Sequence, residues 1–228
     1  MKLLLTSGGL TTKSIVNTLR KLAGRPYENL NAVFIPTAAN VEEGDKWWLV
    51  EALEAAKKLK FKSLDIVDIA ALKPEWVKKR VQVADIILVG GGNCFYLSYW
   101  MQKSGLMNLL PELLKTRVYV GISAGSMVVT ASLRISSAAL ERFNQLSDAE
   151  YEELGPKDES SAKTAQLVDF VIRPHLNSRW FPKIRIKYLS KIAKEFPITM
   201  YAIDDKTAIK VEGEMIEVIS EGKWKKFN

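Results

Sequence analysis

Residues 117–126 read RVYVGISAGS, in which a run of alternating β-formers passes directly into a glycine-rich turn. The glycines of a G-x-S-x-G sequence let a chain turn sharply between a strand and a helix, so that the serine is lifted above the sheet. Gly121, Ser123 and Gly125 have this spacing, and the apolar residues 126–133 predict the start of a helix. The stretch therefore predicts a central strand, a sharp turn that exposes Ser123, and an α/β fold around them.

Short strands and helices alternate on the N-terminal side of this turn. β-Branched and aliphatic runs predict strands at residues 2–7, 31–38, 62–67, 85–92 and 117–123. Apolar residues spaced three and four apart predict helices at residues 11–23, 43–59, 72–82, 94–103 and 107–116. Such alternation is typical of a three-layer α/β fold, in which a mostly parallel sheet carries helices on both faces.

The pattern changes after residue 126. Residues 136–165 are polar and rich in Ser, Asp and Glu, which predicts a surface excursion that could form a lid or part of a pocket wall. The remaining sequence predicts a strand at 166–174, a helix at 180–195, and adjacent strands at 198–205, 207–213 and 214–220. No repeat or interdomain linker is visible, so we expect a single domain spanning residues 1–228.

The composition is that of an ordinary soluble globular protein, with 228 residues of which 47% are hydrophobic. Cys94 is the single cysteine and cannot form an internal disulfide. The apolar start at residues 1–6 is far too short for a signal-peptide core or a bilayer-spanning helix. We therefore expect a cytoplasmic protein without a membrane role.

The formal net charge of +7 would suit an acidic partner. However, lysines alternate with apolar residues at 76–80, 183–195 and 223–226, as they do on the solvent side of an amphipathic helix or of an edge strand. Nucleic-acid binders usually concentrate their charge in a patch or a tail. The scattered charge predicts no nucleic-acid partner, and the alternative suggested by the net charge is a protein that binds nucleic acid or another acidic polymer.

A serine becomes a strong nucleophile only when a base lies within hydrogen-bond reach and is oriented by a third group. The chain has one histidine, His175, which follows the predicted strand 166–174 and comes directly after Pro174. Ligands of open parallel sheets bind outside the carboxyl ends of the strands, so Ser123 and His175 are expected at the same edge. The alternatives are that Ser123 only caps a helix and that His175 is structural.

Two adjacent acids, Asp204 and Asp205, follow the predicted strand at 198–205. Alternation along a strand sends neighbouring side chains to opposite sides, so one of the two carboxylates can face His175. The alternative is that DDKT, residues 204–207, is a turn chosen for its turn-forming residues.

Residues 89–95, VGGGNCF, end a predicted strand with three glycines, which lets bare backbone N–H groups approach a ligand. We expect the N–H groups of Gly92 and Ala124 to bind an oxyanion. The P-loop Lys-Ser/Thr is missing, so nucleotide binding is not favoured. Cys94 is expected to be a small buried residue at a helix start. No histidine cluster or Cys-x-x-Cys pair is present, so neither a metal nor another cofactor is expected.

The segments VGGGNCFYL, GISAGS, RPHLNS and AIDDKTAI, in this order, resemble the serine peptidases of the aspartyl dipeptidase (peptidase E) and cyanophycinase family. The resemblance extends over essentially the whole chain and implies a fold related to class I glutamine amidotransferases. It further implies roles for individual residues: Ser123 as nucleophile, His175 as general base and then acid, Gly92 and Ala124 as oxyanion hole, and Asp205 as the partner of His175 with Asp204 in reserve.

The chain departs from this family in two respects, the composition of the excursion at 136–165 and the position of an arginine. The arginine with which aspartyl dipeptidases hold the substrate's side-chain carboxylate would fall near Pro182, where no arginine stands. Candidate substrate-binding residues are instead Asn93, Arg173, Asn177, Arg179 and Arg185. Trp47 and Trp48 are expected to make core or partner contacts rather than to contact substrate.

The sequence thus predicts a serine peptidase, as a monomer or homodimer, that hydrolyses short peptides, with N-terminal aspartyl peptides among its candidate substrates. The alternative is a non-catalytic relative that uses the same fold to bind a small molecule or a peptide.

Overall fold

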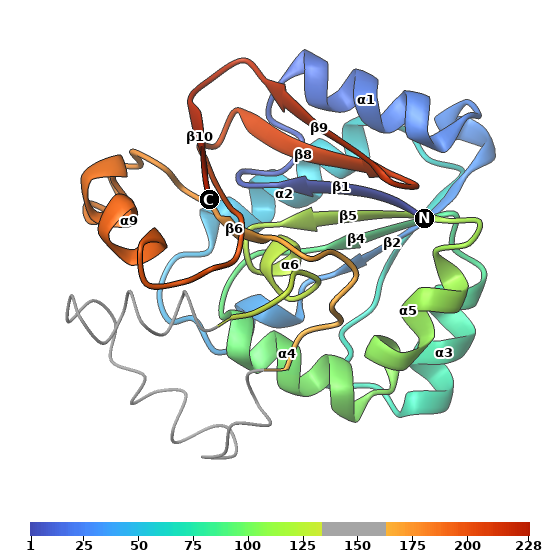
Figure 1. Cartoon of the computed structure of the whole chain (residues 1–228). Coiled ribbons are helices and arrows are strands. Elements are labelled where there is room, and N and C mark those ends of the chain that lie inside the picture. The colour runs from blue at the N-terminus through green and yellow to red at the C-terminus, as the bar shows by residue number, and fades with distance from the viewer. Residues whose placement is uncertain (134–162) are drawn as a thin grey trace.

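The structure is a computed structural model that describes residues 1–133 and 163–228 (Figure 1). The predicted excursion at 136–165 therefore lies outside the described residues except for residues 163–165.

A seven-stranded sheet forms the centre of the molecule, with the strand order β3-β2-β4-β5-β1-β8-β9. The first five are mutually parallel: β3 (Ser63–Ile66), β2 (Asn31–Ile35), β4 (Ile86–Val89), β5 (Val118–Ile122) and β1 (Lys2–Thr6). The last two, β8 (Thr207–Glu212) and β9 (Met215–Ser220), form an antiparallel hairpin beside β1. The predicted turn between them is present at Gly213, whose φ of 60° favours glycine.

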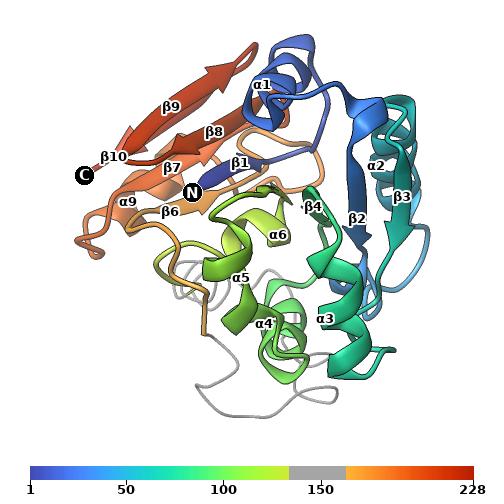
Figure 2. The same ribbon diagram turned by 90° about the vertical axis from the view of Figure 1, so that its right-hand side faces the viewer.

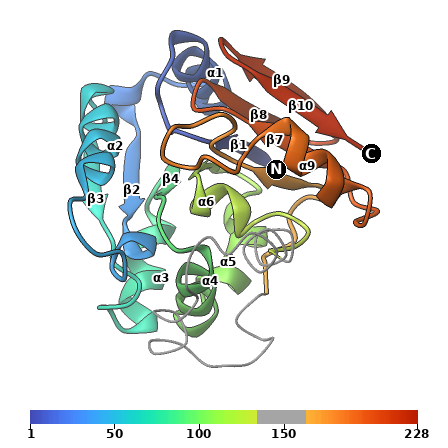
Figure 3. The ribbon, with the colours of Figure 1, turned by 90° about the vertical axis from the view of Figure 1, so that its left-hand side faces the viewer.

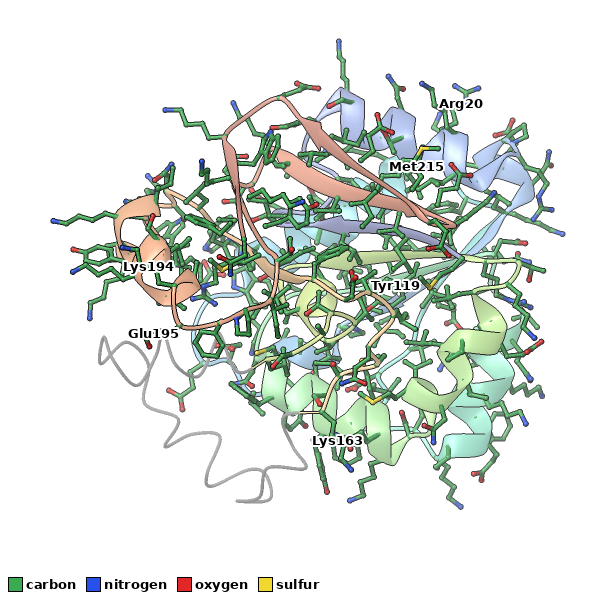
Figure 4. The ribbon with its side chains drawn as sticks, in the orientation of Figure 1. Arg20, Tyr119, Lys163, Lys194, Glu195 and Met215 are labelled. Atoms are coloured by element: carbon green, nitrogen blue, oxygen red, sulfur yellow. The ribbon has the colours of Figure 1, made fainter. Side chains whose placement is uncertain are left out.

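Helices cover both faces of this sheet, as predicted (Figure 2). One face carries α1 (Lys13–Ala23) and α2 (Trp47–Lys58), and the other carries α3 (Pro74–Gln82), α4 (Cys94–Lys103) and α5 (Leu106–Leu113). Alternate strand residues supply the two cores: Leu4 and Val120 face α1 and α2, whereas Leu3 and Tyr119 face the opposite layer. Tyr119 accordingly lies in the interior of the molecule (Figure 4).

A second, three-stranded sheet carries the C-terminal part of the chain. It consists of β10 (Trp224–Phe227), β7 (Met200–Ile203) and β6 (Val171–Arg173), in that order. Tyr201 and Ile203 of β7 face the core of the large sheet, while Met200 and Ala202 pack under α9 (Ile186–Ala193) (Figure 3). Burial on both faces explains why this strand is apolar at every position.

The second sheet corrects the expected order of the C-terminal strands. The prediction that 198–205 and 207–213 form adjacent strands is wrong, because β7 pairs with β6 and β10 whereas β8 pairs with β1 and β9. Residues 224–226 of the basic segment 223–226 lie within an edge strand, β10, which was one of the two alternatives for this segment.

Two predicted helices are shorter than expected. The helix after the glycine-rich turn is only α6 (Ala124–Met127), because the chain then leaves to pair the Ala131 N–H with the Phe170 carbonyl oxygen. α9 begins at Ile186 rather than near residue 180, which leaves 175–185 as a loop.

Charged side chains and helix length bear on possible partners. Three labelled basic residues, Arg20, Lys163 and Lys194, lie on different sides of the molecule (Figure 4). Among the helices of 1–133 and 163–228, none is both long and apolar enough to cross a bilayer.

Candidate active site

The strand β5 ends in a strained turn at Ser123, whose φ and ψ are 50° and −108°. Such a conformation costs a non-glycine residue about 1–3 kcal/mol and persists only where the surroundings impose it. Close backbone packing imposes it here, since a Cβ on Gly125 would lie 2.1 Å from the Val89 carbonyl oxygen and one on Gly121 would lie 2.6 Å from the Ser126 nitrogen. The turn predicted from G-x-S-x-G is therefore present, with both glycines required.

His175 lies directly opposite this turn. It follows β6 and Pro174, has a left-handed φ of 63°, and places Nε2 at 2.8 Å from Ser123 Oγ. Ser123 comes from the large sheet and His175 from the end of a strand in the second sheet, so the packing of the two sheets brings the pair together.

Asp205 is the acid that faces the histidine. Its Oδ1 lies 2.7 Å from His175 Nδ1, so the Nδ1–H donates to the carboxylate and Nε2 is left to accept from Ser123. Burial alone would raise the pKa of the Asp205 carboxyl, but the hydrogen bond and the electrostatic attraction from His175, together with the hydrogen bond from Ser7, hold this pKa below its ordinary value. Asp205 is therefore ionised and orients the ring.

Asp204 has a different environment. Its carboxylate accepts hydrogen bonds from the backbone N–H groups of Lys206 and Lys223 and from the Thr207 hydroxyl. Asp204 thus stabilises the turn between β7 and β8. Both alternatives for the Asp-Asp pair hold together, since one acid faces the histidine and the other builds the turn.

Ser7 is a residue of this site that the sequence reasoning missed. Its hydroxyl donates to Asp205 Oδ1 at 2.6 Å and accepts from the His175 backbone N–H at 2.8 Å, and its side chain is fully buried. A polar residue directly after the strand at residues 2–6, at the carboxyl edge of a parallel sheet, was the available signal.

The glycine loop after β4 runs beside Ser123. A Cβ on Gly91 would lie 3.3 Å from the Ser123 Cβ, and Gly92 has φ +126° with the Ala38 carbonyl oxygen where its Cβ would be. Within the described part of the chain, the backbone N–H groups of Gly91, Gly92 and Ala124 have no protein acceptor. Backbone donors are therefore available on both sides of the serine hydroxyl.

The polar candidates for substrate binding fall into two groups. Asn93 and Arg185 hold local structure, which does not support the predicted contact with substrate. The Asn93 side-chain oxygen caps α4 by accepting from the N–H groups of Phe95 and Tyr96. The Arg185 guanidinium donates to the carbonyl oxygens of the loop at residues 178, 181 and 184.

The other three candidates, Asn177, Arg179 and Arg173, have different surroundings. Asn177 is exposed, and Arg179 stacks its guanidinium over the Trp180 ring at 4.6 Å from the centroid. Arg173 Nε is shielded from solvent and has no hydrogen-bond partner among residues 1–133 and 163–228. Burial lowers the pKa of the Arg173 guanidinium, and the neighbouring Cys94 opposes that shift.

The chemistry of the site follows from its hydrogen bonds. A hydroxyl bonded to an imidazole, whose other nitrogen is bonded to a carboxylate, is arranged for nucleophilic attack by the hydroxyl oxygen. In the segments 1–133 and 163–228, no three side chains of His, Cys, Asp or Glu are grouped so that they could hold a metal ion.

Comparisons with known proteins agree on one family. The model of peptidase family S51 matches residues 3–219. An uncharacterized peptidase of Listeria innocua is 31% identical over 197 residues, which cover 83% of this chain and 85% of the relative. A peptidase E of Shewanella oneidensis is 27% identical over 150 residues, which cover 63% of this chain and 57% of the relative.

Solved structures share the fold. The crystal structure of a candidate peptidase E protein from Listeria monocytogenes superposes with a TM-score of 0.75 at 24% identity, covering 97% of this chain and 98% of that one. A peptidase from an acI-B1 Actinobacterium superposes with a TM-score of 0.65 at 20% identity, covering 98% and 88% of the two chains.

Proposed function

The chain belongs to peptidase family S51 and is a peptidase, and from that membership we propose that it hydrolyses short peptides with Ser123 as the nucleophile. The observation that carries the proposal is the pair of linked hydrogen bonds from Ser123 through His175 to Asp205. The distance is 2.8 Å from Ser123 Oγ to His175 Nε2 and 2.7 Å from His175 Nδ1 to Asp205 Oδ1. Such an arrangement on a strained strand-to-helix turn suits acyl transfer.

The proposed reaction has two halves. Ser123 Oγ attacks the scissile carbonyl carbon while His175 Nε2 takes the hydroxyl proton, and the resulting imidazolium is stabilised by ionised Asp205. The negative oxygen of the tetrahedral intermediate accepts from the N–H groups of Gly92 and Ala124. His175 then protonates the leaving amine, and a water molecule, activated by the same ring, releases the acyl group from Ser123.

We further propose that Arg173 selects a negatively charged substrate, with N-terminal aspartyl peptides as the leading candidates. The Nε atom of Arg173 is buried without a hydrogen-bond partner among residues 1–133 and 163–228, which is costly, and a substrate carboxylate would satisfy it. Arg173 lies two residues before His175, so it is close to the reacting groups along the chain.

A panel of dipeptides with N-terminal Asp, Glu, Asn, Ala and Leu tests both proposals. We expect hydrolysis by the wild type, none by Ser123→Ala, and a preference for Asp over the neutral isostere Asn. In Arg173→Met that preference should fall by about 10- to 100-fold, the value of a charge-assisted hydrogen bond. Absence of Ser123-dependent hydrolysis would contradict the peptidase mechanism, whereas an unchanged preference in Arg173→Met would contradict only the role of Arg173.

Ser7 is expected to act as a positioning residue. Ser7→Ala removes the hydroxyl that bonds both Asp205 and the His175 backbone, so kcat should fall about tenfold with little change in KM. The matched control is Ser126→Ala, because Ser126 is equally buried but donates to the Thr6 carbonyl oxygen at 2.7 Å. Equal losses of kcat in the two variants would assign Ser7 a merely structural role.

A further inference from the structure

Two exposed tryptophans contact each other next to the loop that carries the histidine. Trp47, the first residue of α2, is 42% exposed, and Trp180 is 60% exposed. Their ring centroids are 6.1 Å apart with an interplanar angle of 46°. We refer to Trp47 and Trp180 together as the aromatic shelf. Trp47 was expected to make a core or a partner contact, and its 42% exposure leaves the partner contact.

Phe181 links the aromatic shelf to His175. Phe181, the residue after Trp180, stacks on the His175 ring with centroids 4.7 Å apart and planes within 15°. The loop between them is held by its own backbone, since Ser178 N–H donates to the His175 carbonyl oxygen and Asn177 N–H to that of Ile184. The Arg185 guanidinium stabilises this loop further by donating to the carbonyl oxygens of Phe181 and Ser178. These hydrogen bonds and the stacking of Phe181 hold the loop that carries Trp180 against the segment that carries the imidazole.

The proposed chemistry decides which part of a peptide would lie here. His175 has to deliver a proton to the leaving nitrogen, so that nitrogen must come within hydrogen-bond reach of the ring. The residue that carries this nitrogen then extends over the surface on the histidine side of the site. Phe181 stacks on the imidazole, Trp180 is its neighbour in the chain, and the Arg179 guanidinium lies over the Trp180 ring.

We propose that the aromatic shelf and Arg179 bind the leaving residue of the peptide, with an apolar side chain on the two indoles and the free C-terminal carboxylate at the guanidinium. An apolar side chain would cover the parts of the two indoles that remain exposed, which is favourable. An exposed guanidinium pairs with a carboxylate in a bidentate manner. The inference rests on the proposed function, because it takes the direction of the peptide from the role of His175.

Kinetics with dipeptides that differ only in the second residue test this proposal. For C-terminal Leu or Phe, Trp47→Ala and Trp180→Ala should raise KM about tenfold, whereas for C-terminal Gly KM should hardly change. Arg179→Met should raise KM for the free acid and not for the C-terminal amide. The matched control is Trp76→Ala, since Trp76 is 52% exposed and also carries a cation, Lys79, 5.1 Å from its ring centroid.

A binding measurement separates this inference from the peptidase mechanism. In the Ser123→Ala background, a dipeptide ending in Phe should change the tryptophan fluorescence, and adding Trp180→Ala should weaken that binding about tenfold. Absence of binding, or equal effects of Trp180→Ala and Trp76→Ala, would overturn the role of the aromatic shelf. Binding that depends on Trp180, without hydrolysis by the wild type, would instead support the aromatic shelf and contradict the proposed mechanism.

Discussion

Ser123→Ala is expected to lower kcat/KM by about 10⁴- to 10⁶-fold, the range seen when the nucleophile of a coupled triad is removed. The loss is large because, without the Ser123 hydroxyl, His175 and Asp205 have no positioned nucleophile to activate. A water molecule in its place would not be held in position for attack. The fold should be unaffected, since the strain at residue 123 belongs to the backbone and alanine occupies less space than serine.

The measurement is kcat/KM for the best dipeptide of the panel, together with urea unfolding of both proteins. The free energy of unfolding of Ser123→Ala should agree with that of the wild type within about 0.5 kcal/mol, as for substitutions that bury no new polar group. Retention of more than a few per cent of the activity in a correctly folded variant would contradict a nucleophilic role.

Asp205→Asn is expected to lower kcat by about 10⁴-fold, because an amide would favour the wrong tautomer of the imidazole and would leave the imidazolium without a counter-charge. Asp204→Asn is the matched control, since it makes the same chemical change at the neighbouring residue. Its carboxylate bonds the turn between β7 and β8 and does not face His175. It should leave kcat nearly unchanged and lower the free energy of unfolding by about 1–3 kcal/mol.

Steady-state kinetics and urea unfolding of both variants check this contrast. Most of the effect of Asp205→Asn should appear in kcat, and most of the effect of Asp204→Asn in the unfolding midpoint. The reverse ranking in kcat would make Asp204 the partner of His175.

Local patterns in the sequence account for most of the large sheet. Apolar periodicity predicts strands β1 to β5 and the helices between them. It does so because the apolar pattern of each element reflects which of its own faces are buried. The turn at Ser123 is equally local, since Gly121 and Gly125 are required by backbone approach within a few residues. The set of Ser123, His175 and Asp205 could be proposed because each residue follows a strand at the carboxyl edge.

Local sequence patterns could not predict the features that depend on contacts between residues far apart in the chain. Both β7 and β8 are short strands, and only pairing with β6, β10 and β1 assigns them to different sheets. The hydrogen bonds of Ser7 join residues that are 168 and 198 positions apart. Trp47 and Trp180 likewise meet across the fold, so neither local spacing nor hydrophobicity reveals the aromatic shelf.

The proposed nucleophile is tested most directly by covalent labelling with a fluorophosphonate, followed by intact mass measurement and peptide mapping. The hydrogen bonds that link Ser123, His175 and Asp205 predict one equivalent of label per chain, located on Ser123. Labelling should be lost in Ser123→Ala and strongly slowed in Asp205→Asn, while Asp204→Asn should react like the wild type. A wild type that takes up no label, or a label that maps to another residue and persists in Ser123→Ala, would contradict the assignment of Ser123.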